Sequence, residues 1–201
     1  MDVPDELVLD IFNRTDLEDL VNLCNSSPYY RSLCDLRFWQ SKFRENQTFL
    51  VQEQNNPRDW VNELKHSINC MGRAKAVFER FKGNEIYSSA EDESSFVPDE
   101  DSILVDLNSV NIVDIFPDFL DKQKINSLLL YSRVRHDEDE RGGQIIIRNR
   151  FNPKVVFETY TIEDKTREYE KTLTDDQTLY LFFLFYYYGV RLYNVNDETI
   201  Y

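Results

Sequence analysis

The side chains best suited to chemistry are few in this sequence. His66 and Cys70 lie four residues apart, a spacing that can hold a metal on one helical face. A structural metal site needs four ligands, and no other His or Cys falls in a recognisable motif with this pair. His136 stands among acidic residues and is expected to be solvated. The five glycines form neither a phosphate-binding loop nor a dinucleotide fingerprint. The sequence therefore predicts no enzyme and no cofactor or metal.

Four arginines form a second group of interest. Arg133 and Arg135 alternate along one predicted strand, and Arg148 and Arg150 along the next, so each pair shares a sheet face. A guanidinium fork suits carboxylates and phosphates. The four arginines are thus a candidate face for an acidic or phosphorylated substrate segment. The alternative is an exposed sheet face that Glu158 and neighbouring acids neutralise.

Composition narrows the class of partner. The formal charge is −14, whereas binding to nucleic acid or to an anionic membrane requires clustered Lys and Arg. The most apolar run, residues 179–190, is shorter than the roughly 20 residues of a membrane span. The first residues carry acids where a signal peptide carries bases. Three cysteines favour a reducing compartment over a disulfide framework. We expect a cytoplasmic or nuclear protein that binds neither nucleic acid nor membrane.

The elements that must position these residues fall into two patterns. Residues 1–48 predict three short amphipathic helices, the second opened by a capping box at Thr15–Glu18 and the third following Ser27-Pro28. Residues 49–83 predict connecting helices, with a long helix starting at Asn56-Pro57. Residues 84–102 are acidic and lose all periodicity, as in a linker or surface loop.

In residues 103–201 the spacing of apolar residues changes to a period of two, which is typical of strands. Strands are predicted at 127–135, 144–151 and 154–162, with 103–107 as a further strand. A capping box, Thr174 with Gln177, opens a helix that is apolar nearly all round and must be buried. The fold class is therefore α+β: an N-terminal helical module and connecting helix, then a small antiparallel sheet with a buried helix.

The order of residues in the first module resembles the F-box family over less than a quarter of the chain. The matching positions are Val3-Pro4, Glu6-Leu7, Ile11-Phe12, Asp16, Asp19-Leu20, Tyr30 and Phe38-Trp39. Val3 replaces the usual Leu, and Tyr30 stands where most members have Trp. Compact proteins with divergent F-boxes are also encoded by large DNA viruses, and the polar, Asn- and Tyr-rich composition resembles theirs.

The resemblance implies an adaptor of an SCF complex, in which the module binds the Skp-type linker of a cullin ubiquitin ligase and the rest holds an unknown protein substrate. It implies partner-binding roles for Val3, Pro4, Leu7, Val8, Ile11, Phe12, Leu20, Tyr30 and Phe38. Trp39 is expected in the core of the module, because it shares a helical face with Phe43. The alternative is a structural or virion protein whose helical module is an assembly surface.

Overall fold

The structure is a computed structural model that describes residues 4–83, 103–105, 112–127, 142–148, 153–160 and 165–193. The chain divides into two compact units, Met1–Met71 and Gly72–Tyr201. This division falls within the long helix α5 (Pro57–Gly83), so each unit includes one part of that helix. The predicted linker, residues 84–102, lies outside the described residues.

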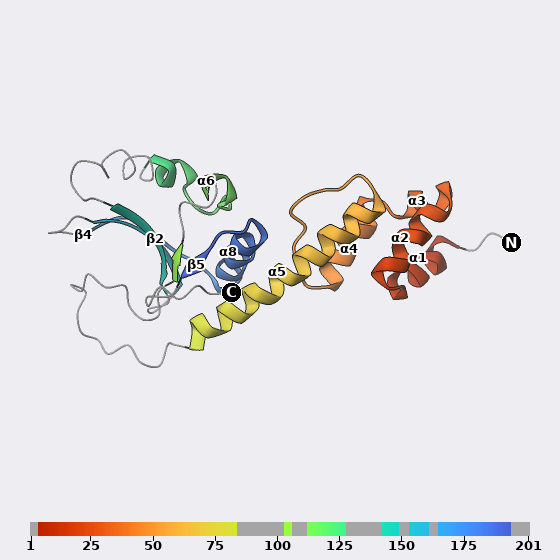
Figure 1. The fold of residues 1–201 in the computed structure, drawn as a ribbon, viewed down its shortest axis with the longest axis horizontal. Helices are drawn as coiled ribbons and strands as arrows, with labels where there is room; N and C mark the ends of the chain where they lie inside the picture. The colour runs from red at the N-terminus through yellow and green to blue at the C-terminus, as the bar shows by residue number, and fades with distance from the viewer. Residues whose placement is uncertain are drawn as a thin grey trace. The chain divides into compact units, whose positions relative to one another are not determined.

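The first unit is a set of short helices (Figure 1), and all but the first begin at a polar side-chain cap. They are α1 (Asp5–Arg14), α2 (Leu17–Ser26), α3 (Pro28–Leu33) and α4 (Leu36–Glu45), followed by the first part of α5. The Ser27 side chain accepts from the Tyr30 N–H and Pro28 occupies the first helical position, as predicted. Asn56 caps α5 by accepting from the Asp59 N–H at 3.0 Å.

Two local predictions in this unit are wrong. The N-cap of α2 is Asp16, which accepts from the Glu18 and Asp19 N–H groups, whereas the Thr15 hydroxyl donates backward to the Ile11 carbonyl. The predicted third helix is divided into α3 and α4. Asp35 takes an extended conformation and accepts from the Phe38 N–H at 2.9 Å, which starts a new helix. In both places an aspartate carboxylate competes successfully for free N–H groups.

Aromatic side chains fill the core of the first unit. Trp39 is fully buried, as predicted, and stacks on Trp60 with ring centroids 5.7 Å apart and planes 5° apart. The Trp39 indole N–H donates to the Cys34 carbonyl at 3.0 Å. Since Trp60 and Leu64 of α5 belong to the same core, this part of the connecting helix is integral to the first unit.

A disulfide joins Cys24 and Cys34, which contradicts the expectation drawn from the cysteine count. Cys24 lies on the buried face of α2 and Cys34 at the end of α3, and their Cα atoms are 6.0 Å apart. The reversal of the chain at Ser27 brings them together, although they are ten positions apart in sequence. Composition carries no information about this turn.

The second unit contains a five-stranded antiparallel sheet of order β4-β3-β2-β1-β5. The strands are β1 (Ile103–Val105), β2 (Gly142–Arg148), β3 (Lys154–Tyr160), β4 (Lys165–Thr172) and β5 (Leu192–Tyr193). Two helices of this unit are α6 (Ile112–Ile115) and α8 (Asp175–Tyr187), and residues 122–127 are also helical (Figure 1).

Strands β1 and β3 lie within predicted segments, and β2 overlaps the predicted segment 144–151 but begins two residues earlier, at Gly142. Strands β4 and β5 were not predicted. The sequence of β4, KTREYEKT, lacks apolar alternation because β4 is an edge strand, and edge strands are commonly charged. Of the predicted strand 127–135, Ser127 ends a helical segment and the remainder lies outside the described residues.

Helix α8 is the apolar centre of the second unit. Thr174 and Gln177 form the predicted capping box, and residues 181–185 are all buried. Phe182 packs edge-on against Phe81 at 5.5 Å, and Phe185 packs against Phe116 at 6.1 Å. The α+β class, with N-terminal helices, a connecting helix and a small antiparallel sheet with a buried helix, is confirmed.

Candidate protein-docking surface

Several side chains assigned to partner binding lie in the core of the first unit. The exposed fractions are 5% for Val8, 1% for Phe12, 0% for Leu20 and 7% for Phe38. Tyr30 is half-buried, and its ring meets Phe12 edge-on at 5.5 Å. These residues shape the unit and would act on a partner through the surface they support. Val3 lies outside the described residues, and Pro4 is exposed.

Leu7 and Ile11 differ from this group because each is 56% exposed. They lie one turn apart on α1, and side chains four residues apart share a helical face. We call these two residues the α1 apolar pair. Its exposure follows from the stripe on α1: Val8 and Phe12 turn inward, which leaves Leu7 and Ile11 on the flank of the same helix.

Tyr29 of α3 is a third large side chain that is exposed in this module. It is not among the partner-binding positions that the F-box resemblance implies. It is 46% exposed, and its hydroxyl donates to the Asp5 carboxylate at the start of α1. The sequence carried a signal for this difference. Tyr30 lies three and four residues before Leu33 and Cys34, which places it on the inward face, whereas Tyr29 precedes that face by one position.

Three of the four arginines of the predicted substrate face, Arg133, Arg135 and Arg150, lie outside the described residues. Arg148 ends β2 opposite Lys154 in the sheet register, and only its backbone is described. Glu158, the acid expected to neutralise the arginines, lies opposite Gln144 of β2 and Arg167 of β4 in the backbone register of the sheet. The assignment of these arginines to a substrate stays a prediction.

Several polar side chains of the first unit serve the fold. Cys70 is buried, with its Sγ 3.7 Å from His66 Nε2, and no three potential metal ligands cluster in the described part of the chain. Lys42 is 4% exposed, and its ammonium donates to the Asn13 carbonyl at 2.9 Å, which ties α4 to the end of α1. Thr48 donates to the Ser67 carbonyl at 3.0 Å.

The pKa values of two tyrosines of α8 are raised by their surroundings in the fold. Burial raises the pKa of Tyr180, with further raising contributions from Tyr188 and Asp118. Burial also raises the pKa of Tyr186 above its usual value, although Arg73 and Arg80 act in the opposite direction. The Arg73 guanidinium lies over the Tyr186 ring at 5.9 Å, which is a packing contact.

Comparison with protein-family models, curated proteins and solved structures found no match for the chain. Among the helices that the structure describes, none has the length and apolarity needed to span a bilayer.

Proposed function

We propose that this chain is a non-enzymatic adaptor that binds the Skp-type linker of a cullin ubiquitin ligase through its first unit and recruits a protein substrate. The observation that carries the proposal is the α1 apolar pair: Leu7 and Ile11 are exposed one turn apart on a helix whose other side is in the core. The F-box-like order of the surrounding residues supports a linker of this kind as the partner.

The expected contribution of the pair is modest but measurable. Fully burying one Leu or Ile side chain contributes about 1.5–3 kcal/mol, and each of these is a little over half exposed. Covering both would contribute about 2–3 kcal/mol. Since 1.4 kcal/mol is a factor of ten in affinity, their loss should weaken binding at least about tenfold.

Co-expression with a Skp-type linker and size-exclusion chromatography test the proposal. Ile11→Asp would place an unpaired charge in a dry contact and should prevent co-elution. Asn13→Asp is the matched control, because it adds the same charge to an exposed polar position of the same helix. Wild type and the Asn13 variant should co-elute with the linker. Co-elution of the Ile11 variant in equal amount would contradict the proposal.

The alternative, a structural or virion protein, predicts a different result in the same experiment. The α1 apolar pair would then pack between copies of this chain. Light scattering of the protein alone would show an oligomer that Ile11→Asp disperses, and no linker complex would form with wild type.

We also propose a cytoplasmic or nuclear location, because the proposed partners act there. The Cys24–Cys34 disulfide is an observation against this location if the bond persists in cells, since reducing compartments keep thiols free. Alkylation of the intact protein in a rapidly quenched cell lysate, followed by mass spectrometry, would measure its state.

A further inference from the structure

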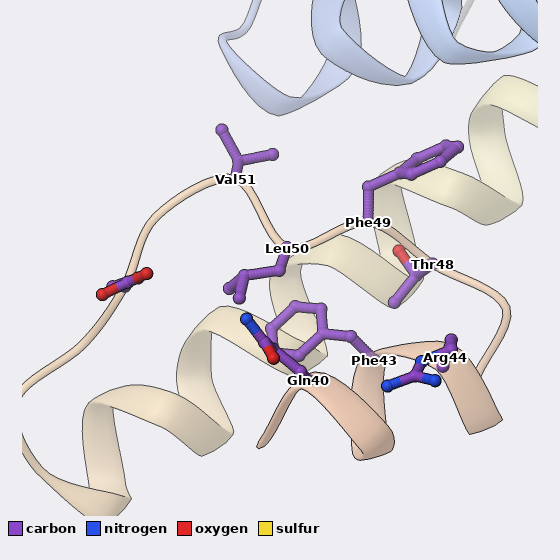
Figure 2. Close-up of a pocket in the computed structure, with 8 residues that line it drawn as sticks. Gln40, Phe43, Arg44, Thr48, Phe49, Leu50 and Val51 are labelled. Carbon is purple, nitrogen blue, oxygen red and sulfur yellow. The ribbon is translucent and has the colours of Figure 1, made fainter. Parts of the chain in front are cut away.

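A pocket lies in the first unit between α4 and the extended chain that follows it. Its volume is 410 Å³, and its lining residues are Gln40, Phe43, Arg44, Thr48, Phe49, Leu50, Val51 and Glu53. Figure 2 shows Gln40, Phe43 and Arg44 on the helix, opposite Leu50 and Val51 on the extended segment. Pockets that hold small ligands or side chains range from roughly 300 to 1,000 Å³, so this one can receive a large side chain.

Four of the residues that line the pocket are apolar. Phe43 is 2% exposed, whereas Leu50 and Val51 are half-buried and Phe49 is 38% exposed. The last three side chains belong to one short segment and are incompletely covered. An apolar side chain placed among them would remove their remaining surface from water, which is favourable.

A row of exposed donor side chains on α4 begins at one wall of the pocket, which Gln40 and Arg44 line. Arg37, Gln40 and Arg44 are all exposed and lie three and four residues apart, so they share one face of α4. We call them the α4 donor line. None of the three side chains makes a hydrogen bond or an ion pair within the described part of the chain. Lys42 on the same helix is engaged, since its ammonium donates to Asn13 and lies 3.4 Å from Glu45.

Two guanidinium groups without a partner among the described residues are notable in a chain of formal charge −14. Arg37 and Arg44 are seven residues apart on the helix, which corresponds to a rise of roughly 10 Å. An extended peptide covers this distance in about three residues. Guanidinium groups bind carboxylates through paired charge-assisted hydrogen bonds, which are stronger than neutral ones.

We propose that this pocket binds an extended acidic segment of a partner protein, with one bulky apolar side chain inserted beside Phe43 and flanking carboxylates on the α4 donor line. Glu53 also lines the pocket and disfavours an acid beside it, so the carboxylates belong on the Arg44 side. The pocket shares no residue with the α1 apolar pair. The proposal therefore goes beyond the adaptor function and does not depend on it.

Fluorescence anisotropy with the full chain tests this directly. The probe is a short fluorescein-labelled peptide with a central leucine between two pairs of aspartates. Wild type should bind it saturably, with an affinity that falls as salt rises. A peptide with serine in place of leucine, and one with lysines in place of the aspartates, should each bind at least about tenfold more weakly.

Variants of the protein test which side chains of the pocket contact the peptide. Arg44→Glu should weaken binding at least about tenfold, and Gln40→Glu, which keeps the side-chain size, should also weaken it. Glu53→Gln should leave affinity unchanged or raise it. The matched control is Arg58→Glu, the same charge reversal at an exposed arginine of α5 that is outside the pocket. Circular dichroism of each variant checks that the fold is retained.

Three outcomes would overturn the proposal. One is the lack of saturable binding to wild type. Another is equal weakening by Arg44→Glu and Arg58→Glu, which would indicate attraction to overall charge. The third is tighter binding of the lysine peptide, lost with Glu53→Gln, which would mean that the pocket selects a basic segment.

Discussion

Replacing Trp39 by alanine tests the central packing argument for the first unit. Trp39 is fully buried, stacks on Trp60 and donates its indole N–H to the Cys34 carbonyl. Truncation would therefore remove an aromatic pair and a hydrogen bond and leave a cavity beside Trp60.

The expected loss can be worked from these contacts. Burial and cavity terms for Trp to Ala amount to about 3–5 kcal/mol. The stacked pair and the hydrogen bond place Trp39 in the upper part of this range, since each contributes about 0.5–1.5 kcal/mol. Trp39→Phe keeps a ring against Trp60 but loses the donor, and should cost about 1–3 kcal/mol.

Urea unfolding followed by far-ultraviolet circular dichroism measures both variants. With a slope of about 1–3 kcal/mol per molar urea, Trp39→Ala should lower the midpoint of the first unit by at least about 1 M. Because the chain has two tryptophans, the emission of Trp39→Phe reports Trp60 alone as the unit unfolds.

The control is Arg37→Ala, an exposed position on the same helix, which should stay within about 0.5 kcal/mol of wild type. Unchanged unfolding of Trp39→Ala would refute the reasoning, because it would mean that Trp39 is on the surface in solution.

Further predictions concern both units. Phe182→Ala should cost about 3–5 kcal/mol, because the side chain is fully buried against Phe81; unchanged thermal unfolding would contradict its burial. Reduction should destabilise wild type by about 2–3 kcal/mol, as expected for the short loop that Cys24 and Cys34 close, and should not affect the double serine variant; rapid alkylation of both thiols in the unreduced native protein would refute the bond. Thr174→Ala should cost about 1 kcal/mol in thermal or urea unfolding, because it removes the capping box of α8, and a cost of zero would show that the cap is not formed. The pKa of Tyr186 is raised in the folded state, so as pH rises the phenol ionises in the unfolded chain before it ionises in the folded protein. The contribution of Tyr186 to folding stability is therefore fully present below about pH 10 and is lost as pH rises through the folded pKa. Urea titrations above about pH 10 should show wild type losing more stability than Tyr186→Phe, and equal losses would contradict the shift.

The candidate docking residues illustrate how far sequence reasoning reached. The sequence predicted a short amphipathic helix here, with its apolar residues in a stripe along one side, and the helix is present. A stripe does not say which of its members face inward, because that depends on where the neighbouring helices pack. The structure buried Val8 and Phe12 and left Leu7 and Ile11 exposed.

The pocket beside α4 was not predicted, for a related reason. Its walls come from a helix and from the irregular segment after it, and residues 46–56 have no periodicity from which a position could be read. Arg37, Gln40 and Arg44 were visible in the sequence, but the lack of partners for their side chains among the described residues is a property of the folded chain.

Local chemistry accounts for what the sequence determined by itself. The caps at Ser27, Asn56 and Thr174 and the uniformly apolar α8 are set by groups within a few residues of one another, so they could be read in order along the chain. Only the tertiary structure decided the Cys24–Cys34 bond, the stacking of Trp39 on Trp60 and the charged edge strand β4. Each of these depends on the direction the chain takes after a turn, and a small change in that direction alters which distant side chains meet.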